Sequence, residues 1–330
     1  MQETDLDQVV AAITGASSLA LACHTCPDGD ALGSLLALHH LCVAQGKPSV
    51  ASWSEPFEVA PHYRFIPGLD LATKPADFPD APEVMITFDC GSIARLGDLG
   101  RNALAAGTLI VLDHHASNDR FGAINVVEPE AAATAVVVRD LARRLGWPLT
   151  RDAAICLYTG LVTDTGRFQY SNTTPAVFAL AQELASFDLP IADMSRQLFE
   201  EHRFEYLRLV GDCIGRAELD RDLRFVSTAV TLDDLHTHGC QVEETEGLID
   251  LVRRASEAEV SCVLKETPEG LRVSLRALAE TDVSAIAAHF GGGGHRYAAG
   301  FVSQGTVADV LAEIKVELHH QRQIHPPELG

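Results

Sequence analysis

Residues 84–89 read VMITFD and residues 108–113 read TLIVLD, and these two stretches decide the fold. Each is a continuous apolar run that ends in an aspartate, which is typical of a strand buried on both faces of a parallel sheet. A similar run, SLALAC at 18–23, is followed by a helical pattern over 31–44 and then by PSVASW. This alternation of strands and helices predicts an α/β domain with a doubly wound parallel sheet.

Beyond residue 130 the alternation of strands and helices gives way to a mainly helical sequence pattern. Residues 131–187 read as mainly helical, and two more helices are expected within 190–212. The last part of the chain predicts a smaller α+β domain, with strands near 224–230, 259–266 and 271–277 and helices near 243–255, 282–290 and 306–321. We therefore expect a catalytic domain at 1–187, a helical linker at 188–215 and a substrate-binding domain at 216–330, with an active-site cleft between the two domains.

The charge of the chain restricts its ligands. The formal net charge of the 330 residues is −21, and residues 1–215 hold 14 Lys and Arg against 27 Asp and Glu, while residues 216–330 hold 11 against 19. A protein that binds long nucleic acid needs a cationic track to neutralise phosphates. Long duplex nucleic acid is therefore not expected as a partner, whereas a short anionic ligand needs only a local cluster of donors and metal ions.

Other features indicate a cytoplasmic location. The apolar runs fall short of the ~20 residues of a membrane-spanning helix, and the start MQETDLDQVV lacks the basic cluster of a secretion signal. The eight cysteines are scattered singly, apart from Cys23 and Cys26, which suits a reducing compartment better than a disulfide framework. No second cysteine pair completes a zinc site, so Cys23 is expected to pack at the end of a strand.

Aspartates and histidines gather at predicted strand ends. They form four groups: His24, Asp28 and Asp30; Asp89; Asp113, His114 and His115; and Asp164. Four carboxylates at one sheet edge would cost several kcal/mol per buried charge unless cations neutralised them. Two divalent cations about 3.5–4 Å apart would balance the four negative charges. A mixed set of histidine and carboxylate ligands favours Mn²⁺, with Mg²⁺ or Co²⁺ as substitutes.

Four segments resemble the successive motifs of the DHH phosphoesterase superfamily, to which the RecJ nucleases also belong. They are CHTCPDGDALGS at 23–34, FDCG at 88–91, LDHHASN at 112–118 and YTGLVTDTGRFQYSNT at 158–173. In addition, SLR at 274–276 and GGGGHRYAAG at 291–300 resemble the DHH-associated C-terminal domain. Within the superfamily the chain looks most like the branch of nanoRNases that are also phosphatases of 3′-phosphoadenosine 5′-phosphate (pAp).

This resemblance implies roles for individual residues. One metal ion would be held by His24, Asp28 and Asp89, and a second by Asp30, Asp89, His114 and Asp164. Catalytic roles fall to His115, which would face the scissile phosphate, and to Asp113, which would orient the imidazoles. Substrate contacts are implied for Ser274, Arg276, Gly292, Gly293, Gly294 and His295, where glycines expose backbone N–H groups to an anion.

The resemblance also implies an activity. A bifunctional phosphoesterase would cleave short oligoribonucleotides, including dinucleotides, to mononucleotides and would dephosphorylate pAp by in-line attack of a metal-activated hydroxide. Three alternatives stay open: a RecJ-like single-strand exonuclease, a phosphodiesterase for linear or cyclic dinucleotides, and a nucleotide-binding regulator without catalysis. The acidic charge disfavours the first, and the full set of metal-binding residues disfavours the last. The choice between RNA and DNA substrates and the formation of a homodimer are also left open.

Overall fold

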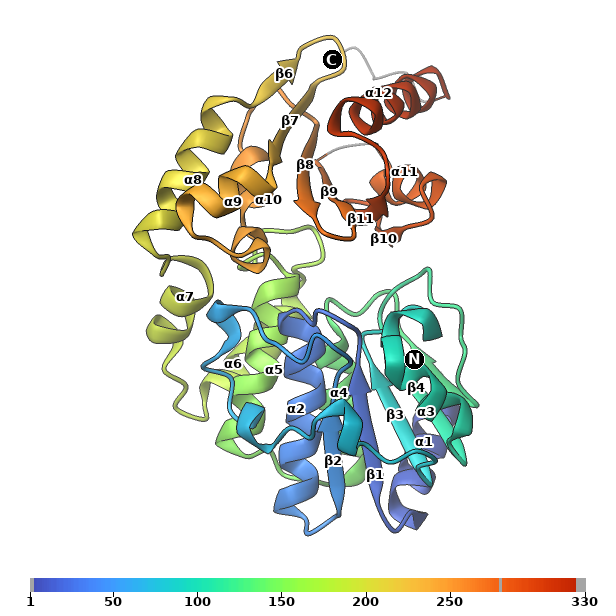
Figure 1. The fold of residues 1–330 in the computed structure, drawn as a ribbon. Helices are drawn as coiled ribbons and strands as arrows, with labels where there is room; N and C mark the ends of the chain where they lie inside the picture. Colours follow the sequence, from blue (N-terminus) through green and yellow to red (C-terminus); the bar gives the residue numbers. More distant parts are fainter. Residues whose placement is uncertain (1–2, 279–280, 325–330) are drawn as a thin grey trace. The chain divides into compact units, whose positions relative to one another are not determined.

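The computed structural model describes residues 3–278 and 281–324. Its chain divides into two compact units, Met1–Glu200 and Glu201–Gly330, whose helices and strands are labelled in Figure 1. This division falls inside the expected linker, between the helices α7 (Ile191–Phe199) and α8 (Phe204–Gly215). The boundaries 1–187, 188–215 and 216–330, and the cleft between the domains, stay predictions.

A five-stranded parallel sheet forms the centre of the first unit, which confirms the predicted α/β class. Its order is β2-β1-β3-β4-β5, with β1 at Leu19–Cys23, β2 at Ser49–Ser52, β3 at Val84–Phe88, β4 at Thr108–Asp113 and β5 at Ile124–Val127. In the parallel register Cys23 lies opposite Phe88, and Phe88 lies opposite Leu112. The strands β1, β3 and β4 therefore end side by side, and the residues that follow them share one edge of the sheet.

Helices cover both faces of this sheet. On β1, Leu19 and Leu21 join a core formed with α1 (Glu3–Gly15), α2 (Gly29–Ala44), α4 (Thr134–Leu145) and α5 (Arg151–Asp164). The alternate residues Ala20 and Ala22 join a second core with η4 (Ile93–Leu99) and α3 (Gly100–Ala105) on the opposite face. The sheet is thus doubly wound, as predicted.

Close packing of α2 against α5 sets the geometry beside the sheet edge. A Cβ atom on Gly33 would lie 2.4 Å from the carbonyl oxygen of Cys156, and one on Gly160 would lie 2.6 Å from Oδ1 of Asp30. Neither distance is tolerated by a real side chain, so glycine at both positions lets the helices approach. The rest of the first unit consists of short elements and helices: η1 (Pro61–Tyr63), η2 (Leu69–Leu71), η3 (Pro75–Asp77), α6 (Pro175–Ala185) and α7.

The second unit is the α+β domain that the sequence predicts. Its six-stranded sheet has the order β10-β11-β9-β8-β7-β6, with β6 at Glu218–Asp220, β7 at Phe225–Val230, β8 at Val260–Thr267, β9 at Gly270–Ala277, β10 at Gly293–His295 and β11 at Ala298–Ser303. Only β7 and β8 pair in parallel. The helices are α8, α9 (Leu232–His238), α10 (Leu248–Val252), α11 (Val283–His289) and α12 (Val307–Ile324).

Some features of this unit differ from the sequence pattern, among them α9, β6 and β11, which were not expected. The single helix expected near 243–255 is divided into η5 (Val242–Thr245) and α10, with Gly247, a poor helix former, between them. The glycine run is not only a loop, because Gly293–His295 pairs with β11 as a strand. Among the described residues, no helix is both long enough and apolar enough to cross a membrane.

Candidate metal centre

The sheet edge of the first unit carries most of the predicted metal ligands. His24 follows β1, and Asp89 follows β3 with a left-handed backbone (φ 53°) that turns the chain away from the strand. Asp28 caps α2 by accepting hydrogen bonds from the backbone N–H groups of Asp30 and Ala31. These caps and turns place carboxylates in a defined direction at the edge.

The position of Asp164 corrects the sequence interpretation. We expected it at a strand end, but it is the last residue of α5. The apolar run before it is a helix buried over most of its surface, and such a run cannot be told from a strand by periodicity. The contact of α5 with α2 nevertheless brings Asp164 to the same centre, with Oδ2 3.0 Å from Nε2 of His114.

Asp89 lies between two groups of candidate ligands. Its Oδ2 is 3.7 Å from Nε2 of His24, and its Oδ1 is 3.5 Å from Nε2 of His114. Ligand atoms of His24, Asp28 and Asp89 lie within 4.8 Å of one another, and so do those of Asp30, Asp89 and His114. The first group is the set that the resemblance implies, and the second is the other implied set without Asp164. Asp89 is common to both, and the role of these residues as metal ligands stays a prediction.

The imidazoles are oriented for coordination through Nε2. Nδ1 of His24 lies 2.8 Å from the carbonyl oxygen of Thr25, and Nδ1 of His114 lies 3.1 Å from that of Ala131. A carbonyl only accepts, so each Nδ1 carries a proton, and each Nε2 would offer its lone pair to a cation once it loses its own proton. Both Nε2 atoms face carboxylates of the centre, which is the arrangement a divalent cation requires.

Asp113 is fully buried and organises the following loop. Its Oδ1 accepts hydrogen bonds from the backbone N–H of His114 (2.7 Å) and from Nδ1 of His115 (2.7 Å). Asn118 donates to its Oδ2 (2.5 Å) and to the carbonyl oxygen of Cys90 (3.0 Å), which ties this loop to the turn at Asp89. Asp113 therefore orients the ring of His115, whereas Ala131 faces Nδ1 of His114. Its catalytic role and that of His115 stay predictions.

The sequence interpretation did not single out the start of α4. Asp30, which is fully buried, accepts from the backbone N–H groups of Thr134 (2.5 Å) and Ala135 (2.9 Å) and from the hydroxyl of Ser34 (3.2 Å). The hydroxyl of Thr134 donates to Oδ1 of Asp89 (3.0 Å). The N-terminus of α4 thus fixes the carboxylate of Asp30, and the side chain of its first residue, Thr134, fixes the carboxylate of Asp89. The only sequence signal is a threonine at the start of an apolar helical pattern.

Replacing Thr134 with valine should weaken metal-supported activity about 10–100-fold, the usual effect of losing a residue that positions a metal ligand. Valine keeps the shape of threonine but cannot donate to Asp89. The measurement is activity as a function of Mn²⁺ concentration. Thr87→Val is the matched control, because Thr87 is equally buried in β3 and its hydroxyl faces only the carbonyl oxygen of Ile110. Equal effects of both substitutions would contradict the role of Thr134.

The close approach of the carboxyl and imidazole groups in the centre shifts their pKa values. Burial and the nearby carboxylates of Asp164 and Asp89 raise the pKa of Asp30 well above its ordinary value. Burial, with a contribution from Asp89, raises the pKa of Asp164 to about 6. Burial opposes a charge on His114, but its hydrogen bond to Asp164 and the surrounding carboxylates raise its pKa. The carboxyl groups of Asp30 and Asp164 therefore resist ionisation in the absence of metal. Bound cations would favour their ionised forms.

Asp89 behaves differently. Although burial opposes its negative charge, His115, His24 and His114 surround it and hold its pKa below its ordinary value. Within the described residues, no lysine or arginine forms an ion pair with the carboxylates of the centre. The histidines are thus the only nearby cationic partners, and Asp89 is the carboxylate most ready to bridge two metal ions.

The predicted substrate-binding residues lie in the second unit, and four of them, Ser274, Arg276, Gly293 and His295, share one face of its sheet. Ser274 and Arg276 alternate with buried residues along β9. Across the sheet, Arg276 and His295 are both opposite Ala298 of the intervening strand β11, and Ser274 and Gly293 are both opposite Gly300. The small residues Ala298 and Gly300 lie between the polar ones and do not cover this face. A role in substrate binding stays a prediction.

The glycines in and before β10 allow it to approach β11. A Cβ atom on Gly292 would lie 2.2 Å from the carbonyl oxygen of Gly300, and one on Gly294 (φ 140°) would lie 2.5 Å from that of Ala298. By contrast, Gly293 has open space on its Cβ side. Two of the predicted glycines are therefore needed for strand packing, and the third leaves the backbone accessible.

An ionic cluster extends the cationic part of this face. Lys265 is almost completely buried, and its Nζ lies 3.0 Å from Oε2 of Glu246. Arg272 donates to Oε1 of the same glutamate at 3.2 Å. Nε of Arg276 is buried and has no hydrogen-bond partner among the described residues. Glu246 pairs with two cations, and although burial opposes its charge, the nearby charge of Arg276 also lowers the pKa of Glu246, so this face attracts anions.

Comparison with known proteins decides the family. The model described as "DHH family, N-terminal domain" matches residues 18–161, and that of the "DHHA1 domain" matches residues 225–320. A Thermus thermophilus protein named bifunctional oligoribonuclease and PAP phosphatase NrnA is 32% identical over 318 residues, which cover 94% of this chain and 93% of that protein. The chain belongs to the DHH family. Its DHH match lies wholly within the first unit and includes all predicted metal ligands except Asp164.

Other similar proteins also cover most of the chain. A Streptococcus mutans protein named probable bifunctional oligoribonuclease and PAP phosphatase NrnA is 26% identical over 94% of this chain and 98% of its own length. The crystal structure of an exopolyphosphatase-related protein from Bacteroides fragilis superposes with a TM-score of 0.87 at 24% identity, covering 98% and 97% of the two chains. RecJ from Thermus thermophilus in complex with Mn²⁺ has a TM-score of 0.56 at 14% identity, over 97% of this chain and 55% of RecJ. The last two similarities concern the fold alone.

Proposed function

We propose that this DHH protein is a two-metal phosphoesterase that hydrolyses short oligoribonucleotides to mononucleotides and removes the 3′-phosphate of pAp. The observation that carries the proposal is the convergence of two candidate ligand sets on Asp89 at one sheet edge. The name of the Thermus relative, which is similar over nearly the full length, supports the choice of substrates.

The residues fit a pair of divalent cations. Asp28, Asp30, Asp89 and Asp164 bring four negative charges together, and two imidazoles present Nε2 to them. The first cation would be held by His24, Asp28 and Asp89 and the second by Asp30, Asp89, His114 and Asp164. Imidazole and carboxylate ligands favour Mn²⁺. When bound, the cations would supply a hydroxide near neutral pH and neutralise the phosphate.

His115 is placed to act on the phosphate. Its hydrogen bond to Asp113 and the negative charge of Asp89 raise its pKa, although burial opposes the charged form. Nδ1 donates to Asp113, so we assign the contact with the phosphate to Nε2. A protonated Nε2 would donate to a phosphate oxygen as negative charge develops there, a form of electrostatic stabilisation that is large in phosphoryl transfer.

The second unit would bind the remainder of a short substrate. Arg276, Ser274 and His295 present one guanidinium, one hydroxyl and one imidazole on the same face, with the accessible backbone of Gly293 between them. Arginine binds phosphate through a fork of N–H donors, and glycine N–H groups add to it. The face holds few cations, which suits a ligand with one or two phosphates rather than a long strand.

An assay with Mn²⁺ across five substrates tests this function. We expect turnover of pAp and of diribonucleotides, and kcat/KM at least about tenfold lower for a 20-residue RNA, because an acidic protein gains little from additional phosphates. Dideoxynucleotides and pyrophosphate complete the series. Faster cleavage of the 20-residue RNA would favour a RecJ-like exonuclease. Binding of nucleotides without turnover in the presence of Mn²⁺ would favour a regulator.

A further inference from the structure

The loop after β2 forms a cavity that the metal centre does not use. It has a volume of about 520 Å³, and its lining includes Trp53, Phe57, Glu58, Arg64 and Asp70 together with two aliphatic side chains. None of these residues is a predicted metal ligand or substrate contact. The volume lies within the range of small-molecule sites.

An aromatic wall with an unused donor forms one side. The rings of Trp53 and Phe57 stack with centroids 4.4 Å apart and planes at 23°. Trp53 is only 2% exposed, and its indole Nε1 has no hydrogen-bond partner within residues 3–278 and 281–324. Buried indole N–H groups normally find an acceptor. This N–H is closed off from solvent, so the stacked rings of Trp53 and Phe57 contribute an apolar wall to the cavity.

Three charged side chains complete the lining without partners of their own. Arg64, Glu58 and Asp70 are exposed, and in the described part of the chain their side chains form no ion pair or hydrogen bond. The cavity thus presents one forked donor and two carboxylate acceptors beside aromatic rings. This combination suits a planar heterocycle that has both acceptors and donors on its edge.

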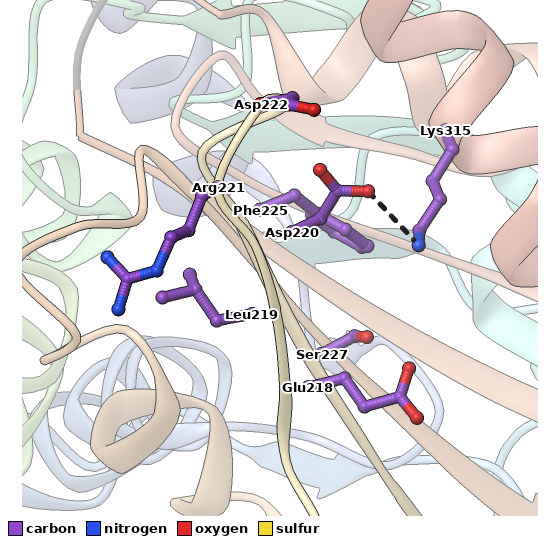
Figure 2. A pocket seen from close by; sticks show the side chains of 8 residues that line it. All are labelled: Glu218, Leu219, Asp220, Arg221, Asp222, Phe225, Ser227 and Lys315. Carbon is purple, nitrogen blue, oxygen red and sulfur yellow. Dashed lines mark ion pairs between the residues drawn. The ribbon is translucent and has the colours of Figure 1, made fainter.

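A second cavity, in the other unit, lacks these features. It measures about 390 Å³ and lies along β6 and α12 (Figure 2). Its Lys315 is already paired with Asp220 at 3.2 Å, and three acidic side chains dominate its lining. No aromatic stack with an unsatisfied donor lines it, so the Trp53 cavity is the stronger site.

We propose that the Trp53 cavity binds the guanine ring of a nucleoside or nucleotide. Guanine offers O6 and N7 as adjacent acceptors, which arginine commonly binds as a pair, and its N1–H and N2–H₂ groups donate to carboxylates. Arg64 would take the first role and Asp70 or Glu58 the second, while Phe57 stacks on the ring. Adenine places an amino group where guanine has O6, which would set a donor against Arg64.

The site is connected to the metal centre through packed loops. Ser54, next to Trp53, accepts a hydrogen bond from the backbone N–H of Asp98 at 2.9 Å. A Cβ atom on Gly97 would lie 2.7 Å from both Ser54 and Thr25, the residue after His24. A series of contacts through Ser54, Gly97 and Thr25 therefore links the cavity to the neighbourhood of His24.

Tryptophan fluorescence tests this proposal directly, because the chain contains only two tryptophans. In a Trp147→Phe background Trp53 is the sole emitter, and guanosine, which has no phosphate, is the probe. Titration is done in a chelator, so that the metal centre plays no part. We expect a saturable change with guanosine and about tenfold weaker binding of adenosine.

Substitutions at the exposed lining decide the outcome without disturbing the core. Arg64→Gln should weaken guanosine binding about tenfold or more, and Asp70→Asn should weaken it less because Glu58 remains. Arg101→Gln, an exposed arginine of α3 outside the cavity, is the matched control. Calorimetry repeats the comparison without relying on fluorescence. Absence of saturation, equal binding of adenosine, or unchanged binding in Arg64→Gln would overturn the proposal, whatever the outcome of the hydrolysis assay.

Discussion

Replacing Asp89 with asparagine should lower the turnover of pAp and of diribonucleotides by about 10³-fold or more. Asp89 is the residue common to both candidate ligand sets, so its loss would weaken both cation sites at once. A bound cation contributes several kcal/mol of transition-state stabilisation, and each ~1.4 kcal/mol is a factor of ten in rate. Asparagine keeps the size of the side chain but removes its negative charge.

The backbone makes asparagine the right substitution. Asp89 has a left-handed conformation, which asparagine adopts more readily than alanine, so the fold should be retained. Circular dichroism checks this. Asp98→Asn is the control, since Asp98 is exposed and its carboxylate contacts none of the ligands. Turnover within tenfold of the unmodified protein in Asp89→Asn would rule out a bridging role.

Removing divalent cations should destabilise the first unit strongly. A ligand present at about 1,000 times its dissociation constant stabilises a protein by about 4 kcal/mol. For a unit of this size, that corresponds to a fall in melting temperature on the order of 10 °C when a chelator is added. Calorimetry with and without Mn²⁺ measures the effect. Asp89→Asn should lose most of it, and an equal effect in that variant would contradict the assignment.

The stabilisation of the folded protein by Mn²⁺ should also increase with pH. The pKa of Asp164 is raised from its ordinary 3.8 to about 6, so the metal-free folded state holds this proton more tightly than the unfolded chain does. Its free energy of unfolding therefore falls as the pH rises from about 4 to about 6. Cations bind the deprotonated carboxylate, so the stabilisation by Mn²⁺ should widen over the same window. A constant difference across that range would contradict this account.

Much of the first unit could be predicted because its signals are local. VMITFD and TLIVLD are buried strands that end in acids, and a parallel sheet places such ends at one edge. Asp164 was assigned to the wrong element because α5 is buried over most of its length and shows no continuous polar stripe that would reveal its period. β5 was not predicted, because a run of only four residues is too short to stand out.

The supporting contacts could not be predicted from the sequence. Thr134 lies 104 residues from Asp30 and 45 from Asp89, so only the packing of α4 against the sheet edge reveals that it holds both. Likewise, Lys265 reads as an ordinary strand residue until its burial and its pairing with Glu246 are known. The unused N–H of Trp53 is also invisible in the sequence, because it depends on what surrounds the ring.

The most direct test is a crystal structure of the protein grown with Mn²⁺, with anomalous diffraction recorded at the manganese edge. The account predicts two peaks on either side of Asp89, one beside His24 and Asp28 and the other beside Asp30, His114 and Asp164. A single peak, or peaks remote from Asp89, would contradict it.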